Sequence, residues 1–266
     1  MRTLLLFIAL AFAGCATTSN TTRSTMPQTF ILVHGAFADA HAFDAVKPML
    51  EARGHRVIAV DLPGHGADTT ALKDLSLEKY VTSVQALVEA QPAPVVLVGH
   101  SMAGLVVAQV AERAPSKVRQ LVFVAAYLPK SGQSLEDLAK GDPTSLVGQN
   151  MQFAADYSTV TIKKEALADA LAADLPKEVQ AFIVAGHKPE PLAPFRGKVT
   201  LTDAAFGSVP RSYVFTTADR AVTPSLQQQL VAAWPNTKTA SLATGHLPFL
   251  SQPQAFVNAL LDLTTR

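Results

Sequence analysis

The fold of this chain is decided by the stretch Val98-Gly99-His100-Ser101-Met102-Ala103-Gly104. It follows the apolar run 94–98, which is typical of a buried strand, and it leads into residues 103–114, which have the composition of a helix ending before Pro115. Small residues on both sides of Ser101 allow the strand and helix backbones to approach closely, although Ala103 stands where Gly is more usual. A tight turn of this kind exposes the serine side chain at the carboxyl edge of a sheet, so Ser101 is predicted to be a nucleophile.

Short apolar runs alternate with amphipathic stretches on both sides of this turn. The runs have continuous Val, Ile and Leu character without strict alternation, which predicts strands buried on both faces of a parallel, doubly wound sheet of the α/β class. The predicted strands are 30–33, 56–61, 94–98, 118–125, 213–217 and 239–242, and the predicted helices are 43–53, 77–90, 103–114, 224–233 and 254–263. The alternation breaks at about 130–210, with helices predicted at 164–173 and 176–185, and this region is interpreted as a cap inserted into one domain.

The first residues have the layout of a secretory signal peptide. Arg2 precedes the apolar run 4–12, which is too short to span a bilayer comfortably. Cleavage after Ala13 is one interpretation. The other is lipidation of Cys15, because Phe12-Ala13-Gly14-Cys15 resembles the lipobox of bacterial lipoproteins. We predict a signal peptide at 1–15, a polar tether at 16–28 and the folded domain at 29–266.

The signal peptide predicts export, either to the periplasmic face of a bacterial membrane as an outer-membrane lipoprotein or as a secreted protein. A membrane contact is expected only through the lipid anchor. The composition is 48% apolar and 16% charged with a formal net charge of +1, which favours a globular protein and gives no nucleic-acid footprint. Cys15 is the only cysteine, so the folded domain has no disulfide. The sequence does not indicate an oligomeric state.

A serine nucleophile needs a general base and an acid that orients it. Two candidates follow strand ends at the edge that carries Ser101, namely Asp219 after 213–217 and His246 after 239–242. Their chain order, Ser then Asp then His, is the one this topology requires. Asp174 and Asp203 in the cap are weaker candidates for the acid.

The oxyanion of the tetrahedral intermediate needs backbone donors. The N–H after the nucleophile, that of Met102, is one, and the N–H of Ala36 in the loop after the first strand is the other. His34 and His100 flank the site and are interpreted as structural. The remaining histidines, His41, His55, His65 and His187, lack the spacing of metal ligands, so no metal and no cofactor is predicted. The predicted substrate pocket contains Phe37, Phe153, Phe182 and Leu247.

Several segments of the chain resemble the plant methylesterase and hydroxynitrile lyase branch of the α/β-hydrolases and its bacterial esterase relatives. They are 30–36, 47–51, 54–57, 59–62, the turn at Ser101, 125–129, 217–224 and Gly245-His246. The resemblance covers most of residues 29–262 and is weakest in the cap. It implies the α/β-hydrolase fold with a helical cap inserted after the sixth strand. It also implies that Ser101, Asp219 and His246 form the triad and that Ala36 and Met102 form the oxyanion hole.

The same branch includes two chemistries. Its hydroxynitrile lyases carry Thr where this chain has Gly35, and after the triad His they carry a Lys that holds the departing cyanide, where this chain has Leu247. Both differences disfavour the lyase. We therefore predict a serine carboxylesterase that hydrolyses small to medium hydrophobic esters, with a small-molecule ester as its partner. The alternatives are an amidase or lactonase, a hydroxynitrile lyase, and a non-catalytic ligand-binding protein.

Overall fold

The computed structural model describes residues 26–265 of the 266. The predicted signal peptide, Cys15 and most of the tether lie outside these residues, so export and lipidation stay predictions. No helix within the described range has the length and apolar character needed to cross a membrane.

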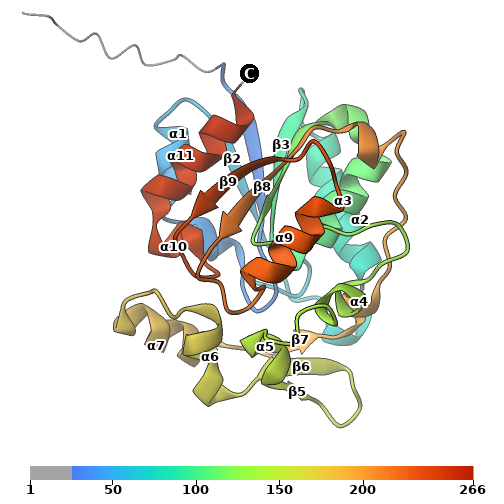
Figure 1. The fold of residues 1–266 in the computed structure, drawn as a ribbon. Coiled ribbons are helices and arrows are strands. Elements are labelled where there is room, and N and C mark those ends of the chain that lie inside the picture. Colours follow the sequence, from blue (N-terminus) through green and yellow to red (C-terminus); the bar gives the residue numbers. More distant parts are fainter. Residues whose placement is uncertain (1–25, 266) are drawn as a thin grey trace, which may run out of the picture.

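A parallel sheet forms the centre of the described chain (Figure 1). It has six strands in the order β2-β1-β3-β4-β8-β9, and every neighbouring pair is parallel. The strands are β1 (Thr29–Val33), β2 (Arg56–Val60), β3 (Val95–His100), β4 (Val118–Val124), β8 (Arg211–Thr216) and β9 (Lys238–Leu242). This arrangement confirms the α/β class predicted from the apolar runs.

Helices cover both faces of the sheet (Figure 1). Ile31 and Val33 of β1 pack into one apolar core, whereas Phe30 and Leu32, which alternate with them, pack into the other. The first core contains side chains of α2 (Leu77–Glu89), α3 (Ala103–Arg113) and α9 (Pro224–Ala232), and the second those of α1 (Lys47–Glu51), α10 (Pro248–Ser251) and α11 (Pro253–Thr264). Burial on both faces explains why the strand sequences are continuously apolar.

One helix differs from its predicted range. Of the stretch 43–53, only Lys47–Glu51 forms an α-helix, α1, and Phe43 is the last residue of a preceding 3-10 turn, η1 (Ala40–Phe43). Pro48 has no backbone N–H and therefore fits only the first turn of a helix, which is where the structure places it. Three further 3-10 turns are η2 (Leu72–Asp74), η3 (Pro115–Lys117) and η4 (Phe206–Ser208).

The cap lies between β4 and β8 and gathers near the carboxyl ends of the strands (Figure 1). Four strands of the described chain precede it, and not the six that the resemblance implies. The cap is also not purely helical, since three of its strands form a separate antiparallel sheet. Its elements are α4 (Leu135–Ala139), α5 (Leu146–Gln149), β5 (Met151–Phe153), β6 (Thr159–Ile162), α6 (Lys164–Leu171), α7 (Lys177–Gly186), β7 (Glu190–Pro191) and α8 (Ala193–Arg196).

Two glycines allow α3 to pack tightly at the turn that carries Ser101. A Cβ atom at Gly99 would lie 2.7 Å from Cγ2 of Val107, and one at Gly104 would overlap the backbone oxygen of Tyr127. Because backbone atoms cannot move aside as a flexible side chain does, Gly104 is the more restrictive position.

We expect Gly104→Ala to lower the free energy of unfolding by about 3 kcal/mol, the upper range for overpacking a buried site. Urea denaturation followed by circular dichroism measures this change. Gly186→Ala is the matched control, because a Cβ there meets no atom within 4 Å. The control should be unchanged or more stable by up to about 1 kcal/mol. Equal stability of Gly104→Ala and the wild type would contradict the close approach of α3 to Tyr127.

Candidate active site

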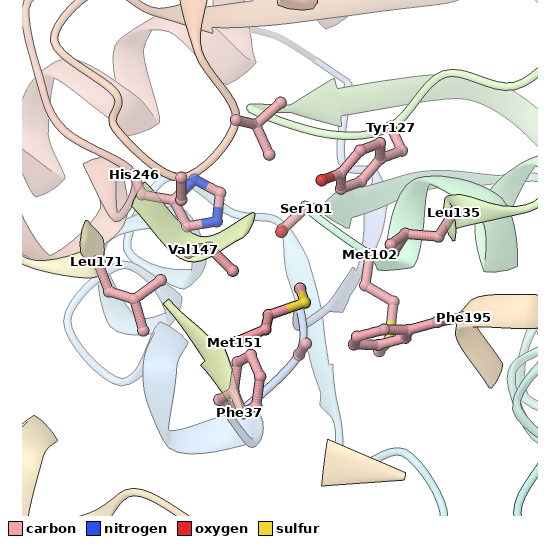
Figure 2. Close-up of a pocket in the computed structure, with 13 residues that line it drawn as sticks. Phe37, Ser101, Met102, Tyr127, Leu135, Val147, Met151, Leu171, Phe195 and His246 are labelled. Carbon is pink, nitrogen blue, oxygen red and sulfur yellow. The ribbon is translucent and has the colours of Figure 1, made fainter. Parts of the chain in front are cut away.

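Ser101 occupies the turn between β3 and α3. Its φ of +53° lies in the left-handed region, which a non-glycine residue adopts only when its surroundings hold it there. The backbone N–H of Ser101 donates to the carbonyl of Val124 (3.2 Å), and its carbonyl accepts from the N–H of Tyr127 (3.1 Å). Contacts to the end of β4 and to the residues after it therefore hold the strained turn, and the Ser101 side chain faces a pocket at the carboxyl edge of the sheet (Figure 2).

His246 and Asp219 come from the loops after β9 and β8. His246 Nδ1 lies 2.8 Å from Asp219 Oδ2, and the Asp219 side chain is fully buried. Asp219 Oδ2 also accepts from the Thr216 hydroxyl (2.8 Å) and the Gln227 side-chain amide (3.2 Å). Its other oxygen, Oδ1, accepts from two backbone N–H groups, those of Ala221 (2.8 Å) and Val222 (3.1 Å). These donors suit an ionised carboxylate, which has only acceptor sites.

The orientation of His246 follows from this contact. An aspartate at Nδ1 keeps the proton on that nitrogen and leaves Nε2 as the basic atom. Nε2 makes no hydrogen bond within residues 26–265, and Ser101 and His246 line the same pocket (Figure 2). The arrangement can therefore accept a proton from the serine hydroxyl.

The two alternative acids lie elsewhere. Asp174, between α6 and α7, accepts from the backbone N–H of Gly245 (2.6 Å) instead of contacting the imidazole. Asp203 lies beside Gly207, which precedes β8. Of the three carboxylates considered, only Asp219 contacts His246.

His34 and His100 are buried behind the site. The His34 Nε2 atom accepts from the Leu62 N–H (3.1 Å), and its Nδ1 lies 2.8 Å from the Gly35 carbonyl, so the partners define a neutral ring. Burial and the nearby charge of His65 lower the pKa of His34 to about 4. The His100 Nε2 atom lies 2.9 Å from the His246 carbonyl, and burial together with the charge of His246 lowers the pKa of His100 well below its ordinary value. Both rings hold the loops of the site and stay uncharged at neutral pH.

The loop after β1 passes directly beside Ser101. A Cβ atom at Gly35 would lie 2.7 Å from the Ser101 Cβ and 2.9 Å from the His100 Nδ1, so only glycine fits without displacement. Ala36 and Met102 line the pocket, and neither backbone N–H donates a hydrogen bond within the described residues. Two unused donors at the mouth of the turn are what an oxyanion hole requires.

The pocket is small and predominantly apolar. It encloses about 40 Å³, and its polar side chains are those of Ser101, His246 and Tyr127. Figure 2 shows the Tyr127 hydroxyl directed toward the same space as Ser101. The apolar lining comes from Ala36, Phe37, Met102, Leu135, Val147, Met151, Leu171, Phe195, Ala221 and Val222.

The predicted pocket residues were partly wrong. Phe37 lines the pocket, whereas Phe153 and Phe182 are 49% and 78% exposed on the outside of the cap. Phe153 stacks on Tyr157 at the surface, and Phe182 lies on the outer side of α7. Leu247 packs with the second apolar core and does not line the pocket. The sequence shows that the cap contains aromatic residues, but it does not show on which face of the cap each of them lies.

Several lining residues were not predicted, above all Tyr127, Met151 and Leu171. Tyr127 follows β4 at the carboxyl edge of the sheet, where ligands bind in this class of fold, and that position could have identified it. Met151 and Leu171 belong to the cap, and no sequence signal distinguishes them from other apolar cap residues.

The four remaining histidines are dispersed: His41 is exposed, His187 lies in the cap, and His55 and His65 are largely buried in the core. Within the described residues, no group of three or more His, Cys, Asp or Glu side chains is placed to hold a metal ion. His41 contacts Asp44, His187 contacts Thr161, and His65 contacts Glu190.

Comparisons with known proteins agree with this architecture. Methylesterase 8 of Arabidopsis thaliana is 30% identical over 97% of this chain and 96% of its own length. A chloroplastic protein of the same plant, provisionally named methylesterase 11, is 31% identical over 88% of this chain, which spans 63% of that longer protein. The crystal structure of a pyrethroid hydrolase from Sphingobium faniae superposes with a TM-score of 0.78 at 27% identity, covering 89% of this chain and 97% of that one. The model of the alpha/beta hydrolase family matches residues 30–259, and the chain belongs to this family.

Proposed function

We propose that this protein is a serine carboxylesterase that acts on small hydrophobic esters through an acyl-enzyme intermediate. The observation that carries the proposal is the buried contact of 2.8 Å between Asp219 and His246 beside Ser101, in a pocket lined mostly by apolar side chains. The names of the relatives, methylesterase and pyrethroid hydrolase, support ester hydrolysis.

The reaction begins with proton transfer from the Ser101 hydroxyl to His246 Nε2 as Ser101 Oγ attacks the ester carbonyl carbon. Asp219 stabilises the imidazolium through Nδ1–H and keeps the ring oriented. The N–H groups of Ala36 and Met102 stabilise the negative charge on the carbonyl oxygen. His246 then protonates the departing alkoxide, and the acyl group remains on Ser101.

Deacylation follows the same sequence of steps, with water as the nucleophile and Ser101 Oγ as the leaving group. His246 removes a proton from the water as its oxygen attacks the acyl carbonyl, and the same two backbone groups stabilise the second oxyanion. Collapse of this intermediate returns the proton to Ser101 Oγ and releases the carboxylic acid.

Two features support hydrolysis over cyanohydrin cleavage. The contact distances around Gly35 leave no room for a side chain beside Ser101, and Leu247 supplies neither a positive charge nor a wall of the pocket. Among residues 26–265 no lysine or arginine lines the pocket, so a departing cyanide anion lacks the lysine that holds it in the lyases. Release of cyanide from a cyanohydrin at a rate comparable with ester hydrolysis would contradict the assignment.

The size of the pocket predicts a preference for short acyl chains. A volume of about 40 Å³ holds a few water molecules at most, so a long acyl group must either extend out of the pocket or displace cap side chains. We expect kcat/KM to be highest for p-nitrophenyl acetate and butyrate and to fall for the octanoate. Absence of turnover on every ester of this series would overturn the proposed function.

Met151→Ala is expected to relax this preference, because Met151 on β5 narrows the pocket from the cap side (Figure 2). The ratio of kcat/KM for the octanoate to that for the butyrate should rise about tenfold, the lower end of the range for one methylene in a hydrophobic pocket. Phe182→Ala is the control, because its side chain is 78% exposed and does not line the pocket. If both variants change the ratio equally, Met151 does not limit the acyl chain.

A further inference from the structure

A buried carboxylate of the cap contacts the loop that carries the proposed oxyanion donor. Glu190 on β7 is only 1% exposed, and its Oε2 accepts a hydrogen bond of 2.7 Å from the backbone N–H of Phe37. Phe37 directly follows Ala36 and has a φ of +61°, so its left-handed backbone needs support from its surroundings. The contact joins residues 153 positions apart in the sequence.

The charge of Glu190 is balanced by one histidine. His65 Nε2 lies 3.1 Å from both carboxylate oxygens of Glu190, and His65 Nδ1 lies 3.1 Å from the carbonyl of Pro63. Both ring nitrogens therefore face acceptors, and only the doubly protonated imidazolium donates to both. A buried carboxylate with a cationic partner and a backbone donor meets the conditions under which a buried charge is tolerated.

The other groups around this pair do not replace His65 as the cation. The His34 ring lies 5.0 Å from the His65 ring and is neutral because Nε2 accepts the Leu62 N–H. The Tyr80 ring lies 5.8 Å away, and burial raises the pKa of its hydroxyl. On the side of the cap, burial lowers the pKa of His187, whose ring packs against Phe37. Asp61, the nearby acid, accepts hydrogen bonds from the Ala40 and Ala67 N–H groups.

We propose that Glu190 is a positioning residue for ester hydrolysis. It holds the Ala36–Phe37 peptide, and through it the adjoining N–H of Ala36, in the geometry of the oxyanion hole, while His65 balances its charge. The proposal rests on the proposed function, since the loop matters for turnover only if the Ala36 N–H stabilises an oxyanion. A cap element thereby completes a part of the site that lies on the core domain.

Two other carboxylates of the cap also accept a hydrogen bond from a backbone N–H of a loop near the triad. Asp174 accepts from the Gly245 N–H next to His246, and Asp142 accepts from the Thr223 N–H (2.8 Å) and hydroxyl (2.7 Å), close to Asp219. Glu190 differs from Asp174 in being almost fully buried, and from both in facing an ionisable partner.

The pH dependence follows from the state of His65. Burial alone would lower the pKa of His65, but the hydrogen bond and the charge of Glu190 outweigh burial and raise it above its ordinary value. The imidazolium therefore persists at and below the ordinary pKa and is lost as the pH rises through the raised value. Above that pH the carboxylate lacks a cation, and kcat should fall on the alkaline side.

The first test is Glu190→Ala in the full chain. Alanine removes both carboxylate oxygens, so the Phe37 N–H loses its acceptor and His65 loses its partner. We expect kcat on p-nitrophenyl butyrate to fall about 10- to 100-fold, less than complete loss of an oxyanion donor, with KM changed less than about threefold. Glu112→Ala is the matched control, because Glu112 also accepts two backbone N–H groups but lies on α3 outside the pocket.

The second test is the pH profile of kcat for the wild type and His65→Gln, which decides the question if Glu190→Ala does not fold. Loss of the alkaline limb in His65→Gln supports the proposal. Identical profiles, or a folded Glu190→Ala variant with kcat within twofold of the wild type, overturn it. Ser101→Ala is measured in parallel, and activity that survives this change would refute the esterase itself, which separates the two failures.

Discussion

Ser101→Ala is expected to lower kcat for p-nitrophenyl butyrate by about 10⁵- to 10⁶-fold, the range found when the nucleophile of a serine hydrolase is removed. Alanine retains the Cβ atom, so the turn between β3 and α3 and its contacts to Val124 and Tyr127 should persist. The loss therefore reports the chemistry of the hydroxyl and not the packing of the site. Initial rates of protein purified away from host esterases, together with thermal unfolding, measure both quantities.

Ser225→Ala provides the control for this change, because it removes a hydroxyl from an exposed position on α9. Its kcat should stay within twofold of the wild type. Labelling with a serine-directed fluorophosphonate should occur in the wild type and in Ser225→Ala, and be absent from Ser101→Ala. Turnover by Ser101→Ala within about a hundredfold of the wild type would show that another residue is the nucleophile.

Asp219→Asn is expected to lower kcat by about 10⁴-fold, the effect of placing the histidine in the wrong tautomer. The surrounding donors decide how the amide is oriented. Oδ1 accepts from the Ala221 and Val222 N–H groups, so the amide oxygen must take that place, and the NH₂ group must face His246 Nδ1. Nδ1 then becomes an acceptor, the ring proton moves to Nε2, and His246 can no longer accept the proton of Ser101.

Asp156→Asn is the matched control, because Asp156 is an exposed carboxylate of the cap whose hydrogen bonds are to Ser158. Its kcat should remain within twofold of the wild type. If Asp219→Asn retained more than about a tenth of the wild-type kcat while folded, His246 would not depend on Asp219 for its tautomer.

The central sheet and the place of Ser101 could be predicted from the sequence because they depend on local and repetitive signals. The apolar runs around Val98 and Ile31 are continuous because both faces of each strand are buried. Asp219 and His246 could be predicted because parallel strands bring their carboxyl ends to one edge, whatever their separation in the sequence. The hydrogen bond between the two side chains is a tertiary detail that only the structure gives.

The cap could not be predicted to the same depth. Strands of two to four residues, such as β5 and β7, are too short to show a hydrophobic period. The inward or outward position of Phe153 and Phe182 depends on partners far away in the sequence. Glu190 carried no signal at all, since a lone carboxylate in a polar region gives no indication that it is buried against the loop after β1.

The three cap carboxylates, Glu190, Asp142 and Asp174, limit which caps can be exchanged in this protein. A cap exchanged as a block between relatives would keep its pocket-lining side chains but would lose the contacts to Phe37, Thr223 and Gly245 unless Glu190, Asp142 and Asp174 were transferred with it. We therefore expect an exchange of the cap to change substrate range and turnover together. A chimera that carries a foreign cap without these acids is expected to bind the donor's substrates and hydrolyse them slowly.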